Sequence, residues 1–187
     1  MSWAERRGEQ WFNGIFAAHY PDIVRYGLRR LADADTSVEI AQEVFEVAWR
    51  RREDVPDNSL PWLYGVARRL LANHWRARRT NPPAYPLPPD TAAIQSANGF
   101  DPSSVPVIAD LRAALARLPE IDREIVRLIG WEQLTIAEAA QVLGCTRTAA
   151  KVRLHRARRR LATVLAAPVP TTSPAHGRGT QVKATAS

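Results

Sequence analysis

The chain has 187 residues, of which 45% are hydrophobic, and its formal net charge at pH 7 is +7. This length suits one or two small domains, and so basic a chain favours a polyanionic partner. The single cysteine, Cys145, excludes an internal disulfide and a thiolate metal site built by this chain alone. No apolar run has the length of a signal-peptide core or a membrane span, so we expect a cytoplasmic protein that does not enter a membrane.

Residues 8–79 predict a first helical domain. Apolar residues recur at helical spacing from Trp11 onward, and Pro21 is expected to break or kink that helix. In residues 37–52 the predicted buried face consists of Val38, Ala41, Val44, Phe45 and Ala48. The polar side of the same helix carries Glu39, Gln42, Glu43, Glu46 and Arg50.

The last helix of this domain ends at Arg79 and combines aromatic with cationic side chains. Its predicted core positions are Leu63, Val66, Ala67 and Leu70, and its outer edge carries Tyr64, Arg68, Trp75 and Arg79. Five arginines and no acid lie between Arg68 and Arg79. Such a strip suits single-stranded nucleic acid, because bases stack on rings while arginines follow phosphates. The alternative is that Tyr64 and Trp75 simply cover the small core, and the sequence of this block leaves both interpretations open.

Two segments lack helical periodicity. Residues 80–107 contain seven of the 14 prolines and predict an extended, flexible linker. Residues 168–187 are polar and predict a disordered tail. The predicted fold class is therefore all-α, with two small helical domains at 8–79 and 108–166 joined by the Pro-rich linker.

The second domain contains a predicted helix-turn-helix. Thr135 and Glu138 form a capping box, Gly144 supplies the turn, and Thr146 can cap the second helix. The second helix has a narrow predicted buried stripe of Ala150, Leu154, Ala157 and Leu161. Its opposite side carries Thr148, Lys151, Val152, His155 and Arg159.

This second helix is strongly cationic. From Gly144 to Ala167 the chain has seven Lys or Arg and no Asp or Glu. A solvated helix face normally mixes both signs of charge, whereas this composition suits insertion into a DNA major groove.

Several motifs, in this order, resemble the extracytoplasmic-function (ECF) sigma factors of bacterial RNA polymerase, in the sigma-70 family. VEIAQEVFEVAWRR is similar to a family helix in which Gln42, Glu43, Phe45 and Trp49 match. WLYGVARRLLANHWRARR resembles the family's promoter-opening helix. LRAALARLPEIDREIVRLIGWEQLTIAEAAQVLG followed by RLHRARRRL matches the family's fourth conserved region.

The resemblance implies a role for each site residue and no catalysis, metal or cofactor. Core RNA polymerase would be bound at its β′ clamp helices and β flap, the clamp contacts coming from Glu39, Gln42, Glu43, Glu46 and Arg50. A second set would contact the minus-ten DNA, both as a duplex and as the separated non-template strand: Asp57, Asn58, Tyr64, Arg68, Arg69, Trp75, Arg76, Arg78 and Arg79. Minus-thirty-five duplex would be contacted by Arg147, Thr148, Lys151, Arg153, His155 and Arg159. An anti-sigma factor is a further candidate partner, because family members are often held inactive by one.

The chain departs from the family pattern at three places. Val38 and Glu39 stand where Glu-Asp is usual, Arg69 replaces a common Asn, and Thr148-Ala149-Ala150 replaces Gly-Thr-Val. The last two changes leave the base contacts, and hence the promoter sequence, open.

Two other functions compete with this interpretation. A stand-alone helix-turn-helix regulator would explain the second domain but not the Gln42–Trp49 helix or the aromatic and cationic strip. An enzyme is disfavoured, because the four histidines are scattered and no Gly-rich phosphate loop is present.

Overall fold

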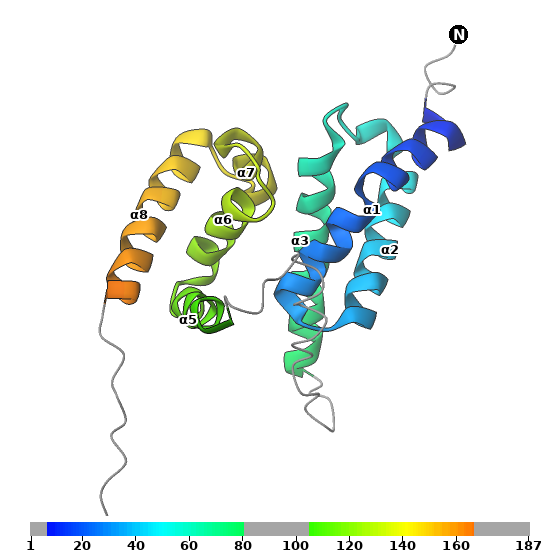
Figure 1. The fold of residues 1–187 in the computed structure, drawn as a ribbon. Helices are drawn as coiled ribbons and strands as arrows, with labels where there is room; N and C mark the ends of the chain where they lie inside the picture. The colour runs from blue at the N-terminus through cyan, green and yellow to red at the C-terminus, as the bar shows by residue number, and fades with distance from the viewer. Residues whose placement is uncertain (1–6, 81–104, 167–187) are drawn as a thin grey trace, which may run out of the picture.

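The computed structural model describes residues 7–80 and 105–166, and these residues form helices and no strand (Figure 1). The first domain consists of α1 (Glu9–Leu31), α2 (Ala34–Arg50), the 3-10 helix η2 (Arg52–Asp54) and α3 (Ser59–Thr80). The second consists of α5 (Val105–Ala116), α6 (Glu120–Gly130), α7 (Ile136–Leu143) and α8 (Arg147–Ala166). The predicted all-α class, with two helical domains, is confirmed.

Helical structure extends into both ends of the segment predicted as linker. α3 includes Thr80, and α5 begins at Val105 rather than after residue 107. The remainder of the predicted linker and the tail at 168–187 lie outside the described residues. None of the described helices is both long and apolar enough to cross a membrane.

The first domain is built on the close pairing of α1 and α2. Ala32 ends α1 in the left-handed conformation, and the Asp33 side chain accepts a hydrogen bond from the Thr36 backbone N–H to start α2. Gly27 permits the close approach, because a Cβ there would lie 3.0 Å from the Ser37 Cβ. The tight turn thus forces the two helices together along their apolar faces.

Two details of the first domain differ from the sequence expectation. α1 is continuous through Pro21 and shows no break, because its packing against α2 offsets the one backbone hydrogen bond that proline removes. Val38 is only half-buried, whereas Ile40 and Leu71 are buried core residues that the helical pattern had not selected.

The second domain contains the predicted helix-turn-helix. Both halves of the Thr135–Glu138 capping box are present, and Gly144 adopts the left-handed conformation with a φ of 62°. Thr146 caps α8 by accepting the Ala149 N–H at 3.2 Å. These local signals set the angle at which α8 leaves α7.

The two domains pack against each other. α3 of the first domain lies beside α7 of the second (Figure 1). A hydrogen bond from the Tyr26 hydroxyl to the Glu124 carboxylate joins α1 to α6. α8 lies on the side of the second domain away from α1, α2 and α3 (Figure 1).

Candidate nucleic-acid interface

α8 presents the predicted cationic face to solvent. Ala150, Leu154 and Ala157 are buried against α6 and α7, and Leu161 is half-buried, so the predicted stripe fixes the rotation of the helix. All residues predicted for the outward side are exposed: Thr148, Lys151, Val152, His155 and Arg159. Arg147 is exposed as well, whereas Arg153 is half-buried at the side of the helix.

One cation of α8 is neutralised from another helix. Arg160 forms an ion pair with Asp122 of α6, a buried carboxylate. Among the described residues the other six Lys and Arg of α8 form no salt bridge: Arg147, Lys151, Arg153, Arg156, Arg158 and Arg159. The face is therefore largely uncompensated, which suits contact with DNA phosphates.

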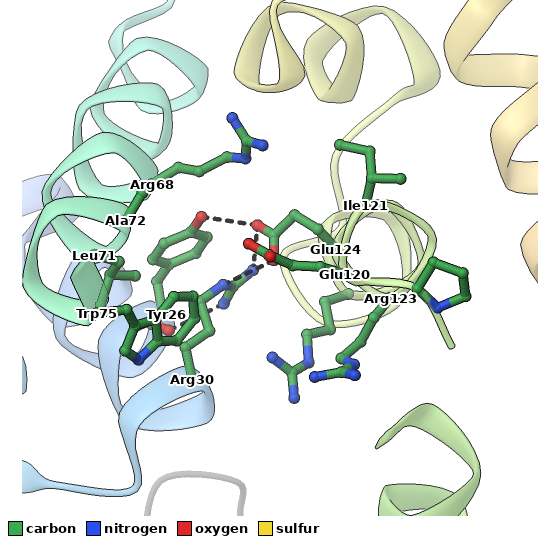
Figure 2. A pocket seen from close by; sticks show the side chains of 12 residues that line it. Tyr26, Arg30, Arg68, Leu71, Ala72, Trp75, Glu120, Ile121, Arg123 and Glu124 are labelled. Carbon is green, nitrogen blue, oxygen red and sulfur yellow. Dashed lines mark hydrogen bonds and ion pairs between the residues drawn. The ribbon is translucent and has the colours of Figure 1, made fainter. Parts of the chain in front are cut away.

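The strip on α3 is only partly open to solvent. Arg69, Arg76 and Arg79 are exposed, whereas Arg68, Trp75 and Arg78 are half-buried. Figure 2 shows Arg68 and Trp75 at the edge of a cavity of about 400 Å³ between α3, α1 and α6.

Tyr64 does not lie on the outer face where the sequence pattern placed it. Its exposed fraction is 2%, and its ring lies 4.9 Å from the Tyr26 ring. Burial raises the pKa of the Tyr64 hydroxyl, and the Glu132 carboxylate of the second domain adds to this effect. The helical period alone put Tyr64 at an edge, whereas in the structure its ring packs against Tyr26 of α1 inside the core.

The loop before α3 presents polar side chains. Asp57 is exposed and pairs with Arg7 at 3.3 Å. Asn58 is exposed as well, and its side-chain N–H donates to Glu138 of α7 at 2.9 Å. The structure thus brings Asn58 next to the second domain, while Asp57 remains exposed to solvent beside its partner Arg7.

α2 presents the predicted acidic face. Its side chains all point to solvent: Glu39, Gln42, Glu43, Glu46 and Arg50. Glu46 and Arg50 pair with each other at 3.7 Å, one helical turn apart.

An exposed aromatic cluster next to this face was missed by the sequence argument. Phe16 and Trp49 are 38% and 36% exposed, and Phe12 lies between them, its ring 6.1 Å from Phe16 and 5.3 Å from Trp49. A groove of about 320 Å³ runs between Phe12, Trp49 and Glu46. The i, i+4 spacing of Phe12 and Phe16 was a usable signal, but the sequence argument used it only to place a helix.

The cavity between the domains is lined by a half-buried cation that forms no ion pair with any described residue, Arg127. Burial and the neighbouring Arg30 lower the pKa of its guanidinium to about 10. In residues 7–80 and 105–166, no three His, Cys, Asp or Glu side chains come close enough to hold a metal ion.

The sequence matches two family descriptions, one in each domain. Residues 15–80 match Sigma-70 region 2, and residues 108–161 match Sigma-70, region 4.

Two curated relatives share about a third of their aligned residues with the chain. The "ECF RNA polymerase sigma factor SigF" of Caulobacter vibrioides is 34% identical over 140 residues, which are 73% of this chain and 75% of that protein. The "Probable RNA polymerase sigma factor RfaY" of Xanthomonas campestris pv. campestris is 32% identical over 160 residues. That alignment covers 80% of this chain but only 39% of the longer Xanthomonas protein.

Solved structures share the fold. The sigma factor RpoE of Bartonella quintana, in complex with the anti-sigma factor NepR, aligns with a TM-score of 0.60 at 21% identity, covering 82% of this chain and 96% of that chain. CnrH, in complex with the cytosolic domain of CnrY, aligns with a TM-score of 0.57 at 21% identity, covering 84% of this chain and 90% of that chain. With both regions matched in order and a relative covered over three quarters of its length, the chain belongs to the ECF RNA polymerase sigma factors of the sigma-70 family.

Proposed function

We propose that this chain binds core RNA polymerase through α2, reads the minus-thirty-five duplex through α8 and helps to open minus-ten DNA through α3. The observation that carries the proposal is the segregation of charge: α8 exposes unpaired cations, whereas α2 exposes acids beside an aromatic groove. A protein that only bound DNA would gain nothing from an acidic and aromatic surface on a separate domain.

The α8 face acts on duplex DNA. Lys151 and Arg159 contact phosphates, and Thr148 and His155 reach base edges from the outward side of the helix. Arg153, at the side of α8, contacts phosphate and positions the helix without reading sequence.

The α3 strip acts on the opened minus-ten element. Trp75 offers a ring for base stacking, and the arginines around it follow the backbone. Flipping a base out of the minus-ten strand costs a few kcal/mol. Contacts from the loop at Asp57 and Asn58, together with contacts from the polymerase, offset this cost. The arginines of this set are Arg68, Arg69, Arg76, Arg78 and Arg79. Tyr64 is buried against Tyr26 and is left out of this set.

The polymerase contact combines charge with apolar area. Glu39, Gln42, Glu43, Glu46 and Arg50 bind the β′ clamp helices, and the second domain binds the β flap. Phe12, Phe16 and Trp49 add the apolar area that a stable interface needs. The protein acts in the cytoplasm and is not an enzyme, since it supplies promoter choice while the polymerase forms the bonds.

An anti-sigma factor is a proposed further partner. RpoE of Bartonella quintana is bound to NepR, and CnrH is bound to the cytosolic domain of CnrY. The exposed aromatic groove of this chain offers a comparable partner an apolar surface to cover.

Run-off transcription tests the proposed function. Bacterial core RNA polymerase is assayed on a genomic promoter library with the wild-type protein, without it, and with the Lys151→Ala, Arg159→Ala double variant. We expect specific transcripts only with the wild-type protein, and their aligned start sites define both promoter elements. Sequence-specific duplex binding without any transcript would instead establish a stand-alone regulator.

A further inference from the structure

A buried ion network joins the two domains. It comprises Arg29 and Arg30 at the end of α1 and Glu124 and Glu132 in the second domain, and we refer to it as the interdomain ion network. Arg30 donates to Glu124 at 2.9 and 3.1 Å and to Glu132 at 2.9 Å, while Arg29 pairs with Glu132. Figure 2 shows Arg30 reaching from α1 to Glu124 across the cavity edge.

The network is shielded from water, and each of its cations is paired with an anion, with the Arg127 guanidinium as a further cation beside Arg30. The side chains of Arg30 and Glu132 are 2% and 0% exposed. Two cations meet two anions, and the Tyr26 hydroxyl donates to Glu124 at 2.8 Å. The Arg30 guanidinium also lies 3.3 Å from the centre of the Tyr26 ring. Such a network is stable only while all partners are present, because each charge left alone would be buried without compensation.

A second contact completes the closed arrangement. α3 and α7 approach so closely that a Cβ built on Gly65 would lie 4.0 Å from the Val142 Cα. Asn58 and Glu138 add a hydrogen bond at the rim of this contact. The domains are therefore held together by a polar network at α1–α6 and an apolar contact at α3–α7.

The closed arrangement conflicts with simultaneous contact to both promoter elements. Elements at minus ten and minus thirty-five lie about 25 base pairs apart, or about 85 Å at about 3.4 Å per base pair. A helical domain of this size has a radius of gyration of about 11 Å, so two such domains in contact place their centres only about 30 Å apart. Residues 81–104 connect them, and a chain of that length extends to at most about 80 Å. Opening is sterically allowed, and engaging a whole promoter requires it.

We propose that the interdomain ion network is an autoinhibitory contact that holds the free protein closed and must be broken before it can direct transcription. The proposal rests on the proposed function. In the closed form Arg68 and Trp75 line the cavity between the domains together with residues of α6, while the outward face of α8 stays exposed. The closed protein therefore retains duplex binding but cannot open a promoter.

A reversible cross-link tests this division. Gly65→Cys and Val142→Cys are combined in a Cys145→Ala background, because a Cβ built on Gly65 would lie 4.0 Å from the Val142 Cα, and a disulfide needs Cα atoms no more than about 7 Å apart. The full-length oxidised and reduced forms are compared in run-off transcription with core polymerase and in binding to a fluorescent 30-base-pair duplex. We expect oxidation to lower transcription at least about tenfold, reduction to restore it, and duplex affinity to change less than about twofold.

The extent of cross-linking tests the ion network itself. Glu132→Gln leaves Arg29 and Arg30 without full compensation only when the domains are closed, so in the double-cysteine protein it should slow disulfide formation at least about fivefold. The matched control is Glu120→Gln, an exposed carboxylate of α6 with no ion pair among the described residues, and it should leave the rate unchanged.

Three outcomes would overturn the proposal. The disulfide fails to form under oxidising conditions, the oxidised protein transcribes as well as the reduced one, or Glu132→Gln cross-links as fast as Glu120→Gln. If neither the wild-type protein nor the oxidised or reduced double-cysteine variant supported transcription, the proposed function would be contradicted. Control of transcription by the closed arrangement would then be excluded as well. The rate of disulfide formation is read without polymerase and so separates these failures.

Discussion

Among single residues, Lys151 and Arg159 differ from Arg160 in one decisive respect. All three are cations of α8, but among residues 7–80 and 105–166 only Arg160 finds a carboxylate partner, Asp122 of α6. An unpaired cation that contacts a DNA phosphate releases about one counterion from the DNA. A cation already neutralised by a carboxylate contributes little to this release and hence to binding.

Lys151→Ala and Arg159→Ala should therefore each weaken duplex binding by about threefold to tenfold and lower the slope of log affinity against log salt by about 0.9. Fluorescence anisotropy with a 30-base-pair duplex at several salt concentrations measures both quantities. Arg160→Ala is the control in the same helix and should leave the slope unchanged. A slope that falls equally in all three variants would contradict the assignment.

If the proposed function holds, promoter opening depends most directly on Trp75. Its half-buried ring lines the cavity but does not belong to the core of the first domain. Base–aromatic stacking contributes about 1–3 kcal/mol per base, so Trp75→Ala should lower promoter opening at least about fivefold with little effect on closed-complex formation.

Permanganate reactivity of the minus-ten thymines measures opening, and Trp75→Phe should restore most of it because a ring is retained. If Trp75→Ala unfolds the protein instead, as circular dichroism would reveal, the ring serves packing and not DNA.

At the scale of helices, the α1–α2 pairing depends on a glycine. A Cβ at Gly27 would meet the Ser37 Cβ at 3.0 Å and its Cα at 3.2 Å, whereas a Cβ at Gly14 of the same helix meets nothing within 4 Å. Gly27→Ala should therefore destabilise the first domain by about 1–2 kcal/mol, because overpacking outweighs the helix propensity that alanine adds.

Gly14→Ala isolates the propensity effect and should stabilise the domain by about 0.5–1 kcal/mol. For a domain of about 70 residues, each kcal/mol shifts the melting temperature by about 4–8 °C, which calorimetry resolves. Opposite shifts in the two variants are expected, and a common direction would rule out the proposed close packing.

The start of α2 should make stability depend on pH. The backbone N–H of Thr36, which donates to the Asp33 carboxylate, lowers the pKa of that side chain. A lowered folded pKa means that the contribution is complete above the unfolded pKa of about 3.9 and is lost as the pH falls through the folded value. Asp33→Ala should cost about 0.5–2 kcal/mol at pH 7 and less at pH 3.

Urea unfolding at the two pH values measures this difference. Asp33→Asn keeps a capping oxygen without the charge, so it should lie within a few tenths of a kcal/mol of the wild-type protein at pH 7. An Asp33→Ala penalty that is the same at pH 3 would show that the cap does not titrate.

The sequence could predict those features that depend on interactions between residues close together in the chain. The capping box at Thr135 and Glu138 and the buried stripe of α8 depend on residues three or four apart, and the structure confirms both. The burial of Tyr64 and the pairing of Arg160 could not be predicted in this way, because their partners lie on other helices. Tyr26 and Glu124, 98 residues apart, share no periodic signal at all.

In the whole molecule, the surfaces that we propose for polymerase and for duplex DNA lie on different domains, and both remain exposed beside the interdomain contact. Gln42 and Glu43 are exposed on α2, while Lys151 and Arg159 are exposed on α8. Residues this far apart without shared partners act independently.

The Gln42→Ala, Glu43→Ala double variant should therefore lower the affinity for core polymerase by about tenfold, as expected when two central polar contacts of an interface are truncated. Its affinity for duplex DNA should change less than about twofold, and Lys151→Ala should show the reverse pattern. Anisotropy with labelled duplex and labelled protein measures the two affinities separately. Equal losses of both would mean that the two surfaces are coupled through the interdomain contact, since nothing else in the described residues connects α2 to α8.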